Sequence, residues 1–412
     1  MVFVFVRVPK IISMSDMFSS RITQDDESYI SLFWTFLKIG STAFGGFMAL
    51  ISVVQNYVVD RRALLSHEEM LNGISLATIL PGPVAVNVVA YSGYKIRGLP
   101  GAFICAFAVI LPSFLLLLVL SHAYFTWGEL PAVSKVFNGF LPAVAAVIIA
   151  AALKMGQKEL LGKIEILIAI CSMSALIFIG GFYITLIIIF VSAVLGYFLL
   201  PHGKSDNYKD FFNKALLPKD LSIVAVVSLV SIGIALFESN TFILFKLFST
   251  FSTMSLLLFG GGFVFIPLIQ EVVVNSYGWL NDKEFIDGIA LGQITPGPIL
   301  ISATFIGYKV SGVIGAIVAT LGIFLPPAIL MLISANFLDL IKNSAAINAI
   351  LKGIRCAVIG IIAAAAYTVL LSADKSWISL SIFILALIAL LKLKLEVIWV
   401  IPTAGLLGYF LF

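Results

Sequence analysis

The sequence predicts an all-α, polytopic membrane protein built from two inverted-topology repeats with broken or re-entrant helices. Three observations carry this prediction. First, 61% of the 412 residues are hydrophobic and only 11% are charged, which is more apolar sequence than a soluble core needs. Second, a Pro-Gly-Pro triplet interrupts an apolar run at Pro81-Gly82-Pro83 and again at Pro296-Gly297-Pro298. Third, the residues around the two triplets recur in the same order, which indicates an internal duplication.

Each Pro-Gly-Pro triplet must break a helix. Its two prolines remove two amide donors, the first proline disfavours the α conformation at the preceding residue, and the glycine is free to adopt positive φ. Because each triplet lies within about 25 nearly uncharged residues, the freed backbone groups need a protein-lined or water-filled cavity. Broken helices at membrane depth in both repeats are typical of transporters whose substrate lies near the midplane. The alternative interpretation is a pair of proline kinks that only shape packing.

Four regions follow along the chain. We expect a cytoplasmic lead-in at 1–28, a first transporter repeat at 29–200, a connector loop plus one extra span at 201–240, and a second transporter repeat at 241–412. In the first repeat we expect an apolar segment that is broken at Phe44-Gly45-Gly46, then the Pro-Gly-Pro segment and further spans, at residues 29–59, 70–95, 99–121, 138–154, 164–180 and 182–200. The extra span is expected at 221–237.

The duplication is visible at a constant offset. Glu284 and Gly288 follow Glu69 and Gly73 by 215 residues, as the second triplet follows the first. After one residue drops out, the offset becomes 214, with Gly307-Tyr308-Lys309 matching Gly93-Tyr94-Lys95 and Leu325-Pro326 matching Leu111-Pro112. Glycines, prolines and polar positions that recur in order over roughly 100 residues exclude a chance motif.

The second repeat is expected to be inverted, because an odd number of crossings separates the two repeats. Lysines and arginines are more numerous on the side that carries the amino terminus, which predicts a cytoplasmic amino terminus. Arg61 and Arg62, compared with the loop at 275–284, favour re-entry of the broken segments over full crossing. The inversion follows under either alternative.

Composition and motifs argue against several functions. The net charge of +4 is spread over short loops, so nucleic acid is not an expected partner. The widely separated Cys105, Cys171 and Cys356 lie in apolar segments, so neither a metal site nor a disulfide is expected. No catalytic or nucleotide-binding motif is present, so we expect no catalytic residues, no cofactor and no enzyme activity. A membrane-embedded enzyme or scaffold is kept only as a rival hypothesis.

A site for an anion would form where the helices restart. A helix that begins after Pro83 or Pro298 offers free first-turn amides and a positive dipole end. The polar side chains expected to complete this substrate site are Gln55, Thr78, Asn87, Gln270, Gln293 and Thr295. The alternative role for each of them is a hydrogen bond between helices.

Four charged residues are candidates for substrate pairing or coupling. Lys38 and Arg355 are cations that could pair with an anion, and Glu271 and Asp287 are carboxylates that could carry a coupling proton. The first-repeat equivalents of the two carboxylates are Asn56 and Asn72. The alternative for all four is a charge that reaches solvent at a segment end.

These motifs resemble the chromate transporter family in its long, two-domain form, over residues 30–410. The family's motif glycines and prolines fall here on Gly45, Gly46, Pro81, Gly82, Pro83, Gly260, Gly261, Pro296, Gly297 and Pro298. The resemblance implies a secondary transporter that moves chromate across the inner membrane, usually outward, with sulfate as a chemically similar competitor. The expected partners are a small oxyanion and the lipid bilayer. Whether a coupling proton and a second copy in a homodimer join them is left open by the sequence. The alternative is a carrier or exporter of another small solute on a similar broken-helix scaffold.

Overall fold

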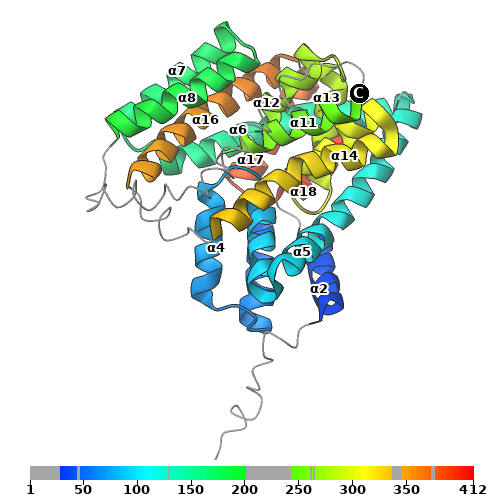
Figure 1. Ribbon diagram of the computed structural model, residues 1–412. Helices are drawn as coiled ribbons and strands as arrows, with labels where there is room; N and C mark the ends of the chain where they lie inside the picture. The colour runs from blue at the N-terminus through cyan, green and yellow to red at the C-terminus, as the bar shows by residue number, and fades with distance from the viewer. Residues whose placement is uncertain are drawn as a thin grey trace, which may run out of the picture.

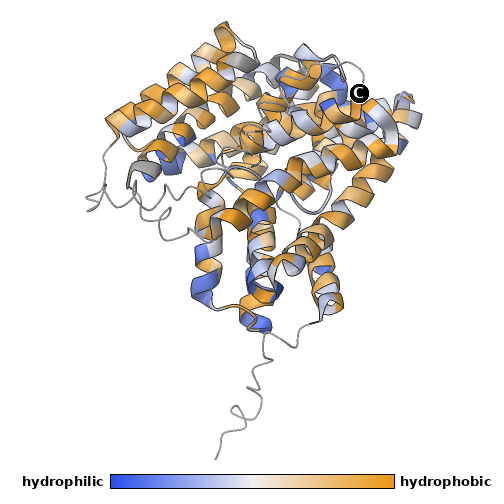
Figure 2. Cartoon of the chain, viewed as in Figure 1, coloured by the Kyte–Doolittle hydropathy of each residue, from blue (hydrophilic) through white to orange (hydrophobic). Residues whose placement is uncertain are grey.

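The chain folds into packed helices (Figure 1). The computed structural model describes residues 28–43, 47–128, 130–200, 243–259, 262, 265–335, 345–372 and 376–412. These residues contain no strand, and four of their helices are long and apolar enough to cross a membrane, at Val84–Trp127, Val133–Glu159, Ile299–Ser334 and Asn348–Thr368. Figure 2 shows hydrophobic residues over most of α7, α8 and the long helices α5 and α14. The prediction of an all-α polytopic membrane protein is therefore confirmed.

Several sequence-based expectations lie outside the described residues. They are residues 1–27 of the lead-in, the connector and extra span within 201–242, and the motif glycines Gly45, Gly46, Gly260 and Gly261. The predicted boundaries at 200 and 240 therefore stay predictions.

The described helices occur in the same order twice. The first series is α2 (Tyr29–Thr42), α3 (Phe47–Gln55), the π-helix η2 (Asn56–Arg61), α4 (His67–Ile79), α5 (Val84–Trp127), α6 (Pro131–Glu159), α7 (Lys163–Phe178) and α8 (Phe182–Leu199). The second is α11 (Ile243–Leu256), α12 (Phe265–Gln270), the π-helix η4 (Glu271–Ser276), α13 (Asp282–Ile294), the short 3₁₀ helix η5 (Ile299–Ile301), α14 (Ser302–Ser334), α16 (Ala345–Ser372), α17 (Trp377–Leu391) and α18 (Val397–Leu411). Even the π-helices recur at the sequence offset, so the duplication extends to local backbone geometry.

Each Pro-Gly-Pro triplet is the tip of a short helical hairpin. In hairpin 1, formed by α4 and the start of α5, Gly73 lies against the ring of Tyr91, which fixes an antiparallel arrangement. In hairpin 2, formed by α13 with η5 and the start of α14, Gly288 lies against Phe305 in the same way. The helices α4 and α13 have 13 residues each, or about 20 Å of length, whereas a bilayer core is about 30 Å thick. These hairpins are therefore too short to cross and have the shape of re-entrant segments.

Capping boxes fix the bases of both hairpins. The Ser66 hydroxyl accepts a hydrogen bond from the Glu69 amide, and the Glu69 carboxylate accepts one from the Ser66 amide. Asn281 and Glu284 make the same reciprocal pair at the start of α13. This arrangement satisfies amide donors that a helix start otherwise leaves unpaired. The open end of each hairpin is thus set by local sequence.

Both long helices fold back beyond the hairpins. Gly98 in α5 has φ 63° and Gly312 in α14 has φ 58°, a conformation that favours glycine. Across the first bend Gly101 touches the carbonyl of Gly93, eight residues earlier, which is impossible in a straight helix. Each long helix is therefore a short arm that completes a hairpin and a long arm that packs in the body of the molecule.

The two repeats are interlocked. The long arms of α5 and α14 pack against each other, α6 of the first repeat packs on α18 of the second, and α16 packs on α8. Gly139 touches the carbonyl of Ala404, and Gly353 touches that of Ser192. Figure 1 places α2 and α4 in the lower part of the molecule and α11 and α13 in the upper part. The terminal helices are thus exchanged between repeats, and the hairpins approach the centre from opposite ends.

Candidate functional site

The two hairpin tips are each held by the other repeat. Gly82 and Gly297 have φ angles of 107° and 104°, as the predicted helix breaks require. The amide of Gly82 donates to the carbonyl of Leu258 at 2.7 Å, and the amide of Gly297 donates to the carbonyl of Ala43 at 2.9 Å. Each acceptor directly precedes the Phe-Gly-Gly segment of its repeat. The reciprocal pairing shows a pseudo-two-fold relation at the centre of the molecule.

Two residues that sequence reasoning missed complete this pairing. A Cβ atom on Gly82 would lie 2.3 Å from Cβ of Pro327 on α14, and one on Gly297 would lie 2.5 Å from Oγ of Ser113 on α5. The Ser113 hydroxyl also donates to the carbonyl of Pro296. Ser113 and Pro327 occupy equivalent positions, directly after the recurring Leu111-Pro112 and Leu325-Pro326. That recurrence was the available signal, because it marks the place where each long arm meets the opposite tip.

The tip of hairpin 1 presents backbone donors and a buried amide. α5 begins at Val84 with Pro83 as its N-cap, so its first-turn amides face the triplet. Asn87 is fully buried and its Nδ2 donates to the Pro81 carbonyl at 3.3 Å. Its Oδ1 has no hydrogen-bond partner among the described residues. The predicted helix start and the predicted Asn87 therefore lie together at one tip.

Arg355 brings a positive charge to the same tip from the other repeat. Its Nη2 lies 3.5 Å from the carbonyl of Thr78, in the last turn of α4. Its Nη1 lies 3.6 Å from Oε1 of Glu159 on α6, and its side chain is 28% exposed. Sequence reasoning did not select Glu159, which stands at the end of α6 and has no motif around it. Arg355 thus reaches the backbone of Thr78, three residues before the first triplet, whereas the Thr78 hydroxyl donates to the Ser75 carbonyl at 2.7 Å and is used within its own helix.

The tip of hairpin 2 differs in charge. Leu141 stands in the first repeat where Arg355 stands in the second. Thr295 is buried and its hydroxyl donates to the Gly292 carbonyl at 2.8 Å, so this side chain is used within its own helix. Gln293 is partly buried beside it. The helix after the triplet starts as the 3₁₀ turn η5 and becomes α-helical only at Ser302. Any anion site at the tips is therefore asymmetric.

Four further predicted residues lie at helix junctions, within η4 or on an exposed helix face. Gln270 donates to Asp282 at 3.1 Å, at the base of hairpin 2, and Gln55 stands at the equivalent junction between α3 and η2. Glu271 accepts a hydrogen bond from Asn275 at 2.7 Å, within η4. Lys38 is exposed on α2. The π-helices continue toward the hairpin bases, and for this reason the side chains at their starts do not reach the triplets.

Asp287 lies inside hairpin 2 instead of near a segment end. It is 1% exposed, and the hydroxyl of Tyr124 on α5 donates to its Oδ2 at 2.8 Å. Sequence reasoning selected Asp287 but not Tyr124, because 163 residues separate the two positions.

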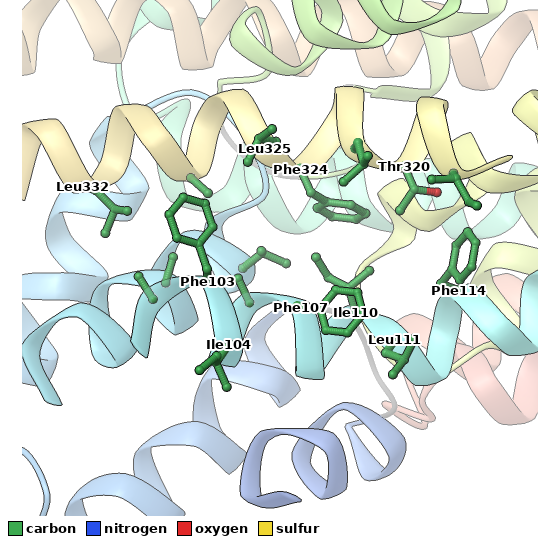
Figure 3. A pocket seen from close by; sticks show the side chains of 17 residues that line it. Phe103, Ile104, Phe107, Ile110, Leu111, Phe114, Thr320, Phe324, Leu325 and Leu332 are labelled. Atoms are coloured by element: carbon green, nitrogen blue, oxygen red, sulfur yellow. The ribbon is translucent and has the colours of Figure 1, made fainter. Parts of the chain in front are cut away.

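A large groove between the long arms of α5 and α14 has the wrong chemistry for an anion (Figure 3). Its volume is about 680 Å³, and its walls are apolar side chains such as Phe103, Phe107, Phe114 and Phe324. The hydroxyl of Thr320, at the edge of the groove, donates a hydrogen bond to the Ala316 carbonyl at 2.7 Å and is therefore not free to bind an anion. A dianion needs donors to replace its hydration. We therefore place the candidate anion site at the hairpin tips.

No group of three or more His, Cys, Asp or Glu side chains gathers in the described part of the chain. Cys105, Cys171 and Cys356 are free cysteines on separate helices.

Short hairpins with proline-glycine tips, set between two interlocked apolar repeats, define a multi-pass membrane protein of the transporter class. Residues 30–197 and 245–409 match the model of the chromate transporter family, so the chain belongs to that family. The two matched regions correspond to the two helix series of the structure.

Several curated relatives cover nearly the whole chain. An uncharacterized transporter of Methanocaldococcus jannaschii is 34% identical over 392 residues, which are 94% of this chain and 95% of that protein. The chromate transport protein of Pseudomonas aeruginosa is 32% identical over 400 residues, 93% of each chain. The chromate transport protein of Cupriavidus metallidurans is 30% identical over 381 residues, 90% of each chain. No solved structure matches the chain.

Proposed function

We propose that this protein is a secondary transporter that carries chromate, and sulfate-like oxyanions that resemble it, across the inner membrane by alternating access. Efflux is the proposed direction, and the amino terminus is proposed to be cytoplasmic. The family match and the relatives named as chromate transport proteins support the substrate class. The observation that carries the proposal is the guanidinium of Arg355 beside the tip of hairpin 1.

The chemistry of this tip suits a tetrahedral dianion. A guanidinium offers a planar set of donors that matches oxyanions. A charge-assisted hydrogen bond contributes about 1.5–3 kcal/mol, and a helix N-terminus adds about 0.3–2 kcal/mol. A sum of a few kcal/mol corresponds to roughly millimolar binding. Such binding is weak enough to release the anion on the other side, as a carrier requires.

Glu159 gives the empty site a counter-charge. At 3.6 Å from Arg355 its carboxylate holds the guanidinium loosely. An arriving dianion would compete with one carboxylate for the same cation, and the second charge of the dianion favours it. The arginine would therefore stay neutralised in both the empty and the loaded state.

The cross-repeat contacts support alternating access. Each tip bonds to the other repeat through one amide, from Gly82 or from Gly297. These amide bonds, with the hydrogen bond from the Ser113 hydroxyl to the Pro296 carbonyl, are few enough to leave the hairpins able to exchange roles. Inverted repeats favour a motion in which the site opens on the side of one hairpin while the tip of the other hairpin stays closed.

Flux of labelled anions into everted membrane vesicles tests the proposed function. We expect saturable chromate accumulation that needs no ATP, is reduced by excess sulfate, and is absent from vesicles without the protein. Arg355→Gln should reduce the flux per folded molecule at least tenfold. Flux that is indifferent to both anions would remove the proposal and favour another small solute.

A further inference from the structure

Asp287 is a buried carboxyl group that forms no ion pair with any cation of the described residues. Of the carboxylates that the structure describes, only Asp287 and Glu165 are buried, at 1% and 7% exposure. Glu165 pairs with Lys352 at 2.6 Å, whereas no lysine, arginine or histidine of the described chain lies within ion-pair distance of Asp287. The hydrogen bond from Tyr124 is its one polar side-chain contact there. An ionised carboxylate in such a place is costly, so the site favours uptake of a proton.

The charged groups around Asp287 do not remove its preference for the protonated form. On its own helix, Lys283 and Glu284 act on it with opposite signs. Lys283 is also hydrogen-bonded to Ser134 on α6 at 3.1 Å, next to Lys135, and Lys309 on α14 pairs with Glu284 at 2.8 Å.

The remaining elements against α13 add aromatic or apolar groups. They are α5, which supplies Tyr124 and the nearby His122, and α12, η5 and α18, whose described helices contain no charged residue. His122 is itself bonded to Tyr308 of α14 at 2.8 Å. In the described part of the chain, Tyr124 therefore contacts the carboxyl group directly, and the charges that act on it, Lys283 and Glu284, lie toward the hairpin base.

The repeat shows that the fold does not need this charge. Asn72 stands at the equivalent position of hairpin 1. An amide of the same size fills that position in a hairpin of the same geometry. Hairpin 2 thus carries an ionisable group at a position where hairpin 1 carries a neutral one. In transporters, buried ionisable groups of this kind mark proton pathways.

We infer that Asp287, with Tyr124, is a proton-binding site that couples proton movement to the transport reaction. The inference rests on the proposed function and names the coupling group within it. Protonation forms one O–H bond on the carboxyl group, and the same proton is released after the hairpins exchange roles.

The position explains how binding would act on transport. The bond between Tyr124 and Asp287 joins hairpin 2 to α5 of the other repeat. Asp287 lies about one and a half turns from the start of α13, so protons would enter from the side on which hairpin 2 opens. Protonation of the carboxylate weakens the hydrogen bond between Tyr124 and Asp287. It also removes the free-energy cost of moving a charge through an apolar region.

Proteoliposomes with the full-length protein and a clamped membrane potential test the inference. Chromate exchange at equal pH on both sides is measured first, and then chromate accumulation driven by a gradient of one pH unit. For wild type we expect exchange, and accumulation that reverses when the gradient is reversed. Asp287→Asn should keep exchange within about threefold but lose the response to the gradient. Asp282→Asn, the same change at an exposed residue of the same helix, should keep both.

Each result has a defined meaning. Accumulation by Asp287→Asn that still follows the gradient overturns the inference. Wild-type accumulation that does not respond to the gradient, with exchange intact, overturns it as well. Both results leave the proposed function intact. Absence of wild-type exchange instead overturns the proposed function and this inference with it. If Asp287→Asn does not fold, Tyr124→Phe decides. Losing a donor to the carboxylate should move the pH of half-maximal coupling upward by about one unit, and an unchanged pH would contradict the inference.

Discussion

The glycine of each Pro-Gly-Pro triplet, Gly82 and Gly297, constrains how the two hairpin tips fit against the opposite repeat. Both glycines combine positive φ with a close neighbour from the other repeat, but the neighbours differ. At Gly82 the neighbour is the ring of Pro327, which has no freedom to move away. At Gly297 it is the hydroxyl of Ser113, which a substitution can remove. The two tips should therefore differ in their response to a methyl group.

We expect Gly82→Ala and Gly297→Ala each to lower chromate flux per folded molecule about tenfold or more. Adding Ser113→Ala should partly restore Gly297→Ala, because the remaining distance from the new methyl group to Cβ of residue 113 is 3.6 Å. The same addition should do nothing for Gly82→Ala. A double-mutant cycle on flux and thermal stability measures this coupling. Equal responses of both glycine variants to Ser113→Ala would contradict the described contacts.

Residue chemistry was only partly predictable from the sequence. The helix breaks at Gly82 and Gly297 follow from local rules, and so does the helix start that carries Asn87. Ser113 and Tyr124 meet partners 183 and 163 residues away, and no local pattern reports such a contact. Gln270 was selected because it recurs at the repeat offset, but its side chain bonds Asp282 at the base of hairpin 2 and not the triplet.

At the scale of elements, helix length supports the predicted re-entry of the Pro-Gly-Pro segments. The charge of the loops favoured re-entry only weakly, whereas 13-residue helices folded against each other are too short for a span. The capping boxes at Ser66 and Asn281 mark where each hairpin opens. The π-helices η2 and η4 were not predicted, because their sequences carry no distinct period.

Cysteines at the two hairpin bases test the opposed openings. In a Cys171→Ser background, whose other native cysteines Cys105 and Cys356 are buried, Ser66→Cys should react with an impermeant thiol reagent only in everted vesicles. Asn281→Cys should react only in right-side-out vesicles. Each change removes a helix cap and should cost about 1 kcal/mol of stability. Labelling of both cysteines from one side would show that the repeats are not inverted.

At the scale of the whole molecule, the repeats form one interlocked body. The constant offset of 215 and then 214 residues made the duplication predictable, and the family match over 30–197 and 245–409 agrees with it. The packing of α8 and α18 on the opposite repeat was not predictable, since the sequences of apolar helices with similar composition do not show which helices pack together. Through this exchange α16 brings Arg355 to the tip of hairpin 1. The account therefore requires that both repeats contribute to a single site.

Equilibrium binding of radiolabelled chromate to purified, folded protein tests this requirement most directly. Wild type, Arg355→Gln and Lys352→Gln are compared, because Lys352 lies on the same helix but pairs with Glu165 at 2.6 Å. We predict binding that is about 10- to 100-fold weaker for Arg355→Gln, from the loss of a charge-assisted contact. Lys352→Gln should lower thermal stability and leave affinity within about twofold. Arg355→Gln protein that is folded and binds chromate as tightly as wild type would contradict the account.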